Sequence, residues 1–378
     1  MENKELYRDK IRGSMIGGAV GDALGYPIEF SLYDEIFFEY GKEGITEYEL
    51  KKGVARISDD TQMSLFTANC INFAQTRLNM RGIGGLPSMY IRKFYLDWLY
   101  TQSHRNSAKD RGKNGISWLL DIPELYADRA PGITCLKALE ALKENDVPEG
   151  DYVKSKRNDS KGCGAIMRIA PLGLTEYLKL ETIDSEAAQL SAITHCHPLG
   201  YIPSVFMAHL IHSVVYEKKE DDRLLDHILA TKEAVSKLYK RNRYLKQMND
   251  LIDLAIELSK NDELDVTNIS QLGFGNVAEE TLAIAIYCSL KYENDFSKGI
   301  IASVNHSGDS DSTGAVTGNI LGAWLGESAI ENKWTDNLEL VDIIKEMADD
   351  LCFGCQMSEY GDYEDPVWER KYIYGRYK

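Results

Sequence analysis

Apolar residues three and four positions apart recur along much of the chain, and this spacing is typical of helices with one buried face. The stretch 61–73 is an example, since Met63, Phe66, Cys70 and Phe73 fall on one stripe. Few stretches alternate apolar and polar residues between turn residues, as half-buried strands do. We therefore predict a mainly α-helical protein. Further stretches with helical spacing lie at 224–238, 251–258, 277–290 and 338–351.

Two of the predicted helical stretches carry glycine at every fourth position, although each glycine destabilises a helix by about 1 kcal/mol relative to alanine. Close contact between two helix backbones would compensate for four glycines on one face. We predict two central helices that pack tightly, with glycine-rich loops as the alternative. The stripes are Gly13, Gly17, Gly21 and Gly25 in the first stretch and Gly314, Gly318, Gly322 and Gly326 in the second.

No internal repeat and no linker rich in Pro, Gly or Ser divides the 378 residues. The charged stretches 218–223 and 237–246 are typical of solvated helix faces or turns. We predict one domain over 1–378, which is long enough to bury a large core. The motif-bearing part of this domain covers about 10–330. An aromatic tail follows at 355–378, and packing of its rings on the core is favoured over stacking on a nucleobase.

Composition limits the partners and the compartment. A net charge of −16 disfavours a long nucleic-acid backbone and an anionic membrane as partners. The longest apolar run, 313–330, is interrupted by Asn319 and Glu327, so a membrane span is not predicted. The first ten residues are highly charged, unlike a signal peptide. We expect a cytoplasmic monomer.

The seven cysteines are odd in number and scattered, which suits a reducing compartment better than a disulfide framework. Cys352 and Cys355 form a lone CxxC without a second pair. Two thiols in a helix core are therefore favoured over a zinc or redox site.

Two short acidic clusters lie about 250 residues apart, each directly before a helical stretch. The first is 57–63 (ISDDTQM) and the second is 305–314 (NHSGDSDSTG). Each offers two carboxylates and hydroxyls, and hard oxygen donors suit Mg²⁺ or Mn²⁺ better than Zn²⁺. Asp and Ser before a helix are also ordinary N-caps, although one cap needs only one side chain. The clusters alone leave a metal site and helix capping equally open.

The order of motifs resembles the ADP-ribosylglycohydrolase family. The specific matches are 17–30 (GGAVGDALGYPIEF), 58–61 (SDDT) and 308–313 (GDSDST). The resemblance runs from about residue 10 to residue 326 and implies an all-α fold, a single compact orthogonal multi-helix bundle of the ADP-ribosylglycohydrolase type. Corroborating matches are 129–132 (RAPG), 161–168 (KGCGAIMR), 194–198 (THCHP) and 277–280 (VAEE).

The resemblance implies a site for two Mg²⁺ ions, with Mn²⁺ as a substitute. Serine stands at 58 and 312 where the family more often has threonine, and it keeps the hydroxyl ligand. Glu29 matches an acidic residue that covers the metal site in relatives, whereas an ordinary surface glutamate is the alternative. The implied metal ligands are Ser58, Asp59, Asp60, Asp309, Asp311 and Ser312, and the implied catalytic residues are Glu29, Asp60, Asp309 and Asp311.

The resemblance also implies substrate contacts. The loop around 161–165 matches a loop that lies against the diphosphate in relatives, where glycines let backbone N–H groups approach phosphate oxygens. His195 aligns with a histidine near the substrate, His197 is expected to be structural, and His306 is expected to orient a ligand carboxylate. The implied substrate-binding residues are Gly162, Cys163, Gly164 and His195.

One stretch departs from the family pattern. Some relatives carry an acidic residue before Ile-Gly in the loop after the third major helix. The comparable stretch here, 109–116 (KDRGKNGI), offers only Asp110. The identity of the general base therefore stays open.

The resemblance implies a metal-dependent hydrolase that cleaves the glycosidic bond between ADP-ribose and a modified protein or small molecule, with arginine favoured as the acceptor. Serine, a nucleobase and a small molecule stay open as acceptors. Two alternatives remain, namely a non-catalytic ADP-ribose-binding or structural protein on the same fold and a hydrolase of another ribosyl glycoside.

Overall fold

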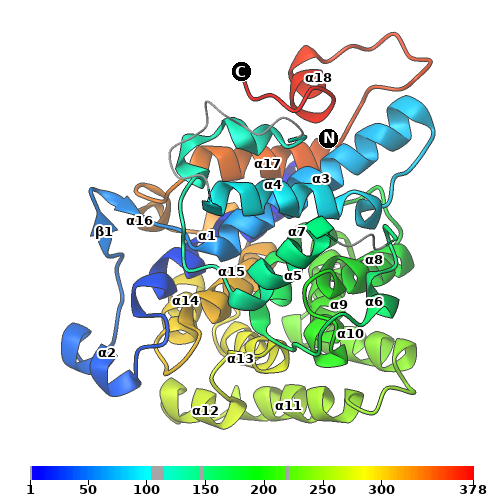
Figure 1. Cartoon of the computed structure of the whole chain (residues 1–378). Coiled ribbons are helices and arrows are strands. Elements are labelled where there is room, and N and C mark those ends of the chain that lie inside the picture. Colours follow the sequence, from blue (N-terminus) through cyan, green and yellow to red (C-terminus); the bar gives the residue numbers. More distant parts are fainter. Residues whose placement is uncertain (1, 104–114, 145–147, 218–220) are drawn as a thin grey trace.

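The fold is all-α, and the only strands among the described residues are two very short ones (Figure 1). The computed structural model describes residues 2–103, 115–144, 148–217 and 221–378. The strands, β1 (Leu50–Lys51) and β2 (Val54–Ala55), form an antiparallel hairpin. The longer helices are α1 (Glu2–Gly25), α3 (Asp59–Arg81), α4 (Ile91–Ser103), α5 (Ile133–Glu144), α8 (Leu180–Ala192), α9 (Pro198–His212), α10 (Leu224–Leu238), α11 (Leu245–Leu258), α13 (Ala278–Lys291), α15 (Ser310–Leu325) and α17 (Val341–Phe353).

Shorter helices connect this framework. They are α2 (Tyr33–Tyr40), α6 (Tyr152–Ser155), α7 (Ala170–Gly173), α12 (Asp265–Leu272), α14 (Phe296–Val304), α16 (Asn332–Thr335) and α18 (Pro366–Tyr372). Two 3₁₀ segments matter for the site, η1 (Tyr26–Ile28) after α1 and η5 (Cys163–Arg168) before α7.

The two glycine stripes pack against each other, as predicted. Helices α1 and α15 run through the middle of the bundle, where α13, α14 and α17 pack on them (Figure 1). A Cβ added at Gly17 or Gly21 would fall closer than 3.0 Å to the backbone of Gly318 or Gly314, respectively. Because the glycines of the two stripes have no side chain, the two helix backbones can lie in direct contact. It also brings the C-terminal end of α1 to the N-terminal end of α15.

Helix boundaries differ from the predicted stretches where tertiary contacts intervene. Helix α3 extends the predicted 61–73 in both directions, and α10 has the predicted limits. Helix α17 begins three residues later than predicted, because Leu338 pairs with Ala55 beside the hairpin. Leu340 then takes a left-handed conformation, with φ of 60°, before the helix starts. The turn predicted at 237–246 joins α10 to α11.

The aromatic tail divides between the core and the surface. Trp368 and Tyr372 of α18 are buried, and the Trp368 Nε1–H donates to Thr76 Oγ1 at 2.8 Å. Tyr360 and Tyr374 are exposed. The expected packing against the core is therefore confirmed for α18 and for Tyr377, whose ring stacks on that of buried Trp118 with centroids 5.1 Å apart.

All seven cysteines are free, in agreement with the sequence. Cys352 lies in α17, but Cys355 lies beyond the end of the helix, because Gly354 has a φ of 62°. The described residues show no third potential metal ligand grouped with this pair.

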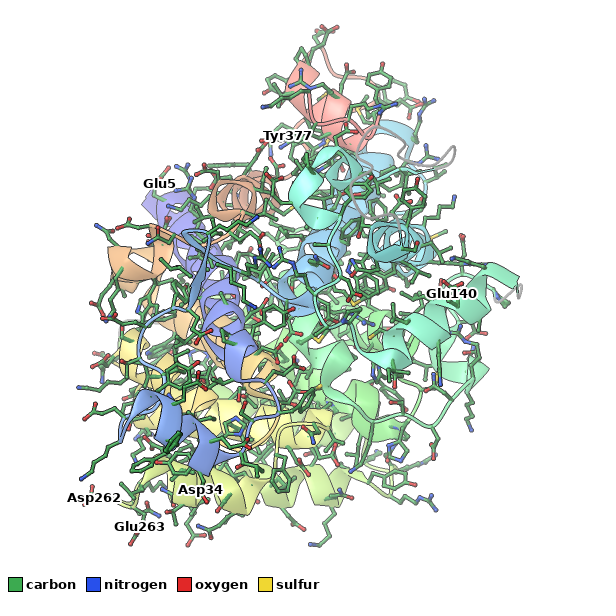
Figure 2. All side chains as sticks on the ribbon, turned by 60° about the vertical axis from the view of Figure 1, so that its left-hand side comes forward. Glu5, Asp34, Glu140, Asp262, Glu263 and Tyr377 are labelled. Atoms are coloured by element: carbon green, nitrogen blue, oxygen red, sulfur yellow. The ribbon has the colours of Figure 1, made fainter. Side chains whose placement is uncertain are left out.

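One helical stretch in the described part of the chain, Pro198–Glu217, is long and apolar enough to cross a membrane, and 89% of its most apolar window is buried inside the protein. It comprises α9 and a π-helical turn. The run 313–330, weighed above for the same property, lies mostly in the buried helix α15. Acidic side chains such as Glu5, Glu140 and Asp262 extend from the surface (Figure 2).

Candidate functional site

A cavity of about 410 Å³ lies where the ends of α1, α3 and α15 meet the loop before η5. Ten of the eleven predicted site residues line it, and the eleventh, Ser58, is fully buried beside Asp59 at the start of α3. The structure therefore brings together the two acidic clusters, the glycine loop and His195. The predicted residues that line the cavity are Glu29, Asp59, Asp60, Gly162, Cys163, Gly164, His195, Asp309, Asp311 and Ser312.

Asp22 of α1 holds the first acidic cluster in place through hydrogen bonds to its backbone. Its carboxylate, fully buried in α1, accepts hydrogen bonds from the Ser58 backbone N–H at 2.9 Å and from the Thr61 N–H at 3.1 Å. The Thr61 hydroxyl donates to the same carboxylate at 2.5 Å. Asp22 therefore orients the N-terminus of α3, from which Asp59 and Asp60 project.

Ser58 is the N-cap of α3, so the capping interpretation of this residue is correct. Its hydroxyl accepts from the Asp60 N–H at 3.2 Å. Asp59 is fixed through its backbone N–H, which donates to the Arg129 carbonyl at 3.1 Å. Asp60 Oδ2 is buried and has no hydrogen-bond partner among the described residues. Capping therefore leaves the Asp60 carboxylate unexplained.

The second cluster starts α15. Asp309 is the N-cap, and its Oδ1 accepts from the Ser312 N–H at 3.3 Å. Its Oδ2 accepts from the Cys163 thiol at 3.0 Å. Asp311 Oδ1 also accepts from the Ser312 N–H, at 2.9 Å. Two carboxylates on one N–H exceed what capping needs.

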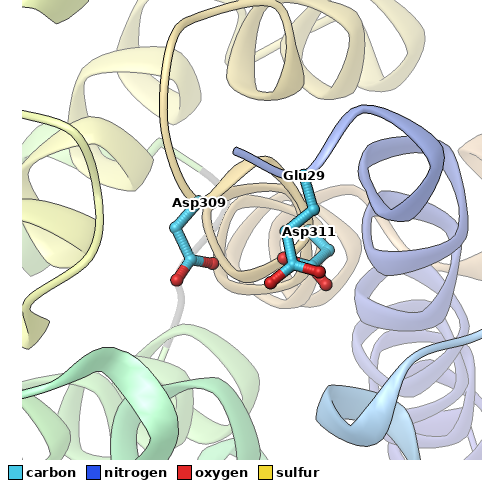
Figure 3. Close-up of side chains that lie close together, drawn as sticks. All are labelled: Glu29, Asp309 and Asp311. Atoms are coloured by element: carbon cyan, nitrogen blue, oxygen red, sulfur yellow. The ribbon is translucent and has the colours of Figure 1, made fainter. Parts of the chain in front are cut away.

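Glu29 reaches the second cluster from the loop after η1. One carboxylate oxygen from each of Glu29, Asp309 and Asp311 lies within 4.8 Å of the others (Figure 3). The loop is fixed by the Phe30 N–H, which donates to the Gly308 carbonyl at 2.7 Å. Phe30 has a φ of 59°, which is rare for a bulky residue and indicates a constrained backbone beside the cavity.

Burial and nearby carboxylates raise the pKa values of Glu29, Asp60 and Asp311, and burial raises that of Asp22. Desolvation, with added repulsion from Asp309 and Asp22, raises the pKa of Glu29 to about 8. Desolvation raises the pKa of Asp22 to about 6, despite its hydrogen bonds. The pKa values of Asp60 and Asp311 are raised well above the usual range by burial and by the neighbouring carboxylates.

This donor set fits a divalent cation. The carboxylates are buried, several point into one cavity, and Asp60 Oδ2 lacks a partner. Nearby positive charge favours the ionised form of such groups, and all of the candidate ligands are hard oxygen donors. The residues that would hold cations here are those of the two clusters.

The glycine loop makes room for a histidine. A Cβ at Gly164 would lie 3.0 Å from His195 Cε1, and one at Gly162 would lie 3.3 Å from His195 Nε2. The Gly162 N–H donates to Ser160 Oγ at 3.4 Å and the Cys163 N–H to the Asn276 carbonyl at 3.3 Å. These two N–H groups therefore already have partners within the protein, whereas we expected them to be free for phosphate.

The other histidines have structural contacts. His197 caps α9, since its Nδ1 accepts from the Leu199 N–H at 3.1 Å, as expected. His306 was expected to orient a ligand carboxylate. Instead its ring nitrogens contact the Ser307 carbonyl at 3.1 Å and the Thr313 hydroxyl at 2.9 Å. Asp110, the other candidate base, lies outside the described residues.

Sequence reasoning missed the roles of three residues that support the site. Asp22 was seen only as part of a motif, although a charged residue on a glycine-striped apolar helix was a usable signal. Thr61 ties Asp22 to α3, and the Cys163 thiol contacts Asp309. Cys163 was expected to contact substrate, and its contact with Asp309 had no signal in the sequence, because the two residues are 146 positions apart.

A larger cavity of about 1140 Å³ lies between the β1–β2 hairpin and the start of α17. None of the residues of the two acidic clusters lines it. It is lined by both basic and acidic side chains, of which Arg129 and Glu339 form an ion pair at 2.7 Å. The smaller cavity, which gathers the carboxylates, is the better candidate for a reaction site.

The sequence profile of the ADP-ribosylglycohydrolase family matches residues 3–360. The chain is 24% identical to ADP-ribosylarginine hydrolase Tri1 of Serratia proteamaculans, over 91% of this chain and 79% of that one. It is 23% identical to ADP-ribosyl-[dinitrogen reductase] glycohydrolase of Rhodospirillum rubrum, over 88% and 91% of the two chains.

A human relative and a solved structure complete the comparison. ADP-ribosylhydrolase ARH3 of Homo sapiens is 26% identical over 55% of this chain and 62% of its own length. A solved chain from an ADP-ribosylglycohydrolase-related protein complex shares the fold, with a TM-score of 0.58 and 22% identity over 92% of this chain and 99% of that one. Because the family profile spans nearly the whole sequence, the chain belongs to the ADP-ribosylglycohydrolase family.

Proposed function

We propose that the protein is a metal-dependent glycosidic-bond hydrolase that removes ADP-ribose from a modified acceptor, with arginine as the favoured acceptor. The observation that supports it most is the convergence of two acidic clusters, distant in sequence, on one cavity of about 410 Å³. The buried Asp60 Oδ2 without a partner adds to it, because a carboxylate oxygen left unpaired inside a protein is costly unless a ligand occupies it.

In this proposal Ser58, Asp59 and Asp60 hold one Mg²⁺ or Mn²⁺ ion, and Asp309, Asp311 and Ser312 hold another. When bound, such a pair orients the ribose diol and a water molecule and stabilises developing negative charge. The ribose passes through an oxocarbenium-like state, as in other glycoside hydrolysis. The carboxylates around the cavity also offset the positive charge that develops there.

Carboxyl groups of the protein itself accept and release the protons of the reaction. Glu29 is the only carboxyl of the group that is half-buried on a loop, and its pKa of about 8 lies close to neutral pH. A group with a pKa near the working pH can both accept and release a proton. In this proposal Glu29, or one of Asp60, Asp309 and Asp311, takes a proton from the attacking water while the bond between C1 of the ribose and the acceptor breaks, and that proton then passes to the departing acceptor atom.

Arginine is favoured as acceptor for two reasons. Tri1, which matches most of this chain, is named for ADP-ribosylarginine. The segment that carries Glu29 continues into a strongly acidic stretch, 33–50, with six Asp or Glu residues and Lys42 as its one basic residue. A cationic acceptor would be attracted to that surface more than a neutral serine would. An ADP-ribosylated protein or small molecule is therefore the expected partner, in the cytoplasm, with the enzyme acting as a monomer.

The test is turnover on defined substrates. Purified protein with Mg²⁺ is incubated with peptides ADP-ribosylated on arginine or on serine, and released ADP-ribose is measured. The proposal expects release from the arginine peptide that is abolished by EDTA and restored by Mg²⁺ or Mn²⁺. Faster release from the serine peptide would correct the acceptor.

Absence of release from both peptides would refute hydrolysis of ADP-ribose linked to arginine or serine. Tight ADP-ribose binding in that case would favour the alternative, a binding protein on the same fold. Release from other ribosyl glycosides alone would favour the second alternative. An exposed acid-to-amide change, Asp262→Asn, serves as the control that leaves the cavity intact.

A further inference from the structure

We propose that Arg168 and Thr194 are positioning residues, which hold His195 as a neutral ring with its Nε2–H directed at the ligand cavity. There the ring would donate a hydrogen bond to an anionic oxygen of the ligand. The identity of that ligand rests on the proposed function. The orientation and tautomer of the ring do not, and they can be tested separately.

The direction of the hydrogen bonds follows from what each group can donate. The fully buried Arg168 guanidinium has only N–H donors, and its Nη2 lies 2.6 Å from Thr194 Oγ1. The Thr194 oxygen therefore accepts. Its single proton goes to His195 Nδ1 at 2.8 Å rather than to the Ser191 carbonyl at 3.5 Å. With Nδ1 acting as an acceptor, a neutral imidazole carries its proton on Nε2.

The partners of the Arg168 guanidinium leave its positive charge to act on the nearby His195 ring. None of its partners among the described residues is a carboxylate. Burial, with added repulsion from Arg168, lowers the pKa of His195 to about 3. An imidazolium is therefore strongly disfavoured here. Besides Thr194, the guanidinium contacts Met63 Sδ, Cys135 Sγ, the Leu190 carbonyl and the Tyr95 ring.

The ring is also fixed sterically. It lies between Gly162 and Gly164 of the loop and Gly200 of α9, and an added Cβ at Gly164 or Gly200 would lie 3.0 Å from a His195 carbon. His195 is only 2% exposed and lines the cavity. Its Nε2 has no hydrogen-bond partner among the described residues, which makes it an available donor at the cavity wall.

A donor of this kind suits an anionic ligand without adding charge. The N–H groups of Gly162 and Cys163 already have partners, so His195 Nε2–H supplies a donor that these two do not. A neutral ring donates one hydrogen bond, and because it carries no charge it does not compete with metal ions for the carboxylates of the two acidic clusters. Preorganised donors in a water-poor cavity stabilise bound anions more than the same donors in water do.

The test compares Thr194→Val, which has the same shape but no hydroxyl, with Thr194→Ser, which keeps the hydroxyl. Ring nitrogens are labelled with ¹⁵N, and His195→Gln identifies the His195 signals among the seven histidines. The parent and Thr194→Ser should show a neutral Nε2–H tautomer down to pH 5. In Thr194→Val the tautomers should mix, because the ring loses its proton donor at Nδ1.

Calorimetry with ADP-ribose tests the ligand contact. Affinity should fall about tenfold in Thr194→Val and less than threefold in Thr194→Ser, and Nε2 of the parent should shift on binding. A parent Nδ1–H tautomer, or equal tautomers and affinities in all three proteins, would overturn the inference. If the parent shows the expected tautomer but binds no ADP-ribose and releases none from peptides, the proposed function fails, while the positioning of the ring stands on the spectra.

Discussion

Buried carboxylates that have no cationic side-chain partner in the described part of the chain distinguish this site from ordinary surface acids. Asp60 and Asp311 are at most 3% exposed, and their nearest charged neighbours are other carboxylates. Such groups destabilise a fold unless protons or cations compensate for them. Their retention at one cavity is therefore an argument for a ligand, independent of any motif.

Asp311→Asn tests this argument at a single residue. The change keeps the shape of the side chain and removes one charge, so coordination weakens while the fold persists. Stabilisation of a transition state by a metal is worth several kcal/mol, and each 1.36 kcal/mol is tenfold in rate. We expect release of ADP-ribose to fall at least about a hundredfold, with circular dichroism unchanged and metal-free stability equal or higher.

The same assay on Asp262→Asn, an exposed acid on the loop before α12, should show the rate of the parent. Equal turnover of Asp311→Asn and the parent would contradict metal catalysis at this cluster. A merely capping role for the acids predicts the opposite pattern, in which stability falls and turnover is kept.

At the residue scale, composition and order of motifs were enough to predict which side chains gather, but not how they are held. Asp59, Asp60, Asp309 and Asp311 were predicted as a group from the resemblance to the family, because the oxygen donors in two short segments by themselves left helix capping equally open. The support of α3 by Asp22 was missed, since that contact joins positions 36 residues apart in sequence and has no local signature. The expectation for His306 was wrong because Thr313, one turn into α15, offers a closer partner than any carboxylate.

At the scale of elements, the pairing of α1 and α15 carries the geometry of the site. Asp22 and the loop with Glu29 lie at one end of α1, and Asp309 and Asp311 lie at the adjoining end of α15. The two helices approach until the Gly17 and Gly318 backbones nearly touch. A change in their separation would move the two sets of acids relative to each other.

Gly318→Leu should therefore destabilise the protein strongly. The added side chain would collide with the Gly17 carbonyl, and overpacking of this kind costs typically 1–3 kcal/mol, with a rigid backbone on both sides favouring the upper end or more. Thermal and denaturant unfolding provide the measurement. Ser270→Leu, on the exposed face of α12, is the matched control and should stay within about 0.5 kcal/mol of the parent.

A second element contact gives a prediction about pH. Asp349 of α17 accepts paired hydrogen bonds from Arg12 at 2.6 Å and 2.6 Å and from Arg8 at 2.9 Å and 3.0 Å. Burial opposes the charge, but the hydrogen bonds and charges of Arg12 and Arg8 lower the pKa of Asp349 below its usual value. Arg8 and Arg12 of α1 thus bind Asp349 of α17 and join the two helices away from the cavity.

Because the folded pKa lies below the unfolded value of about 4, the stabilisation is complete above about pH 5 and is lost as pH falls. Asp349→Asn should lower the free energy of unfolding by about 1–2 kcal/mol at pH 7, after allowance for partial exposure. The difference from the parent should shrink toward pH 3.5 in denaturant unfolding. A difference in unfolding free energy that stays constant across this pH range would show that the charge of Asp349 does not contribute. Asp362→Asn, at an exposed position, is the control.

Helix existence was predictable from apolar spacing, while the ends of helices were decided by distant contacts. The pairing of the glycine stripes could be proposed because four glycines at four-residue spacing in each of two predicted helical stretches have no local explanation. The start of α17 could not, because Leu338 pairs with Ala55 across about 283 positions. The β1–β2 hairpin was missed since two-residue strands leave no alternation to detect.

At the scale of the whole molecule, the fold unites two acidic segments about 250 residues apart that are separate in the unfolded chain. A ligand that needs both segments binds the folded state alone and stabilises it by mass action. Family membership explains why the motifs keep their order. The resemblance to the family implies two ions at this joined site, and their number can be measured.

Two Mg²⁺ ions are expected, about 3.5–4 Å apart, which is the separation usual for two-metal sites. Titration calorimetry should give a stoichiometry of two for the parent and a lower one for Asp311→Asn. An ion present at a hundred times its dissociation constant adds about 2.7 kcal/mol of stability per site, so the Tm of the EDTA-treated parent should rise clearly on adding Mg²⁺. The rise should be smaller in Asp60→Asn and in Asp311→Asn, although these residues come from opposite ends of the chain, because each removes a ligand from the same joined site. Two results would contradict metal binding by these acids: no binding heat with an unchanged Tm, or an equal rise in Tm in all three proteins. Bound protons, and not metal ions, would then offset the repulsion between the carboxylates.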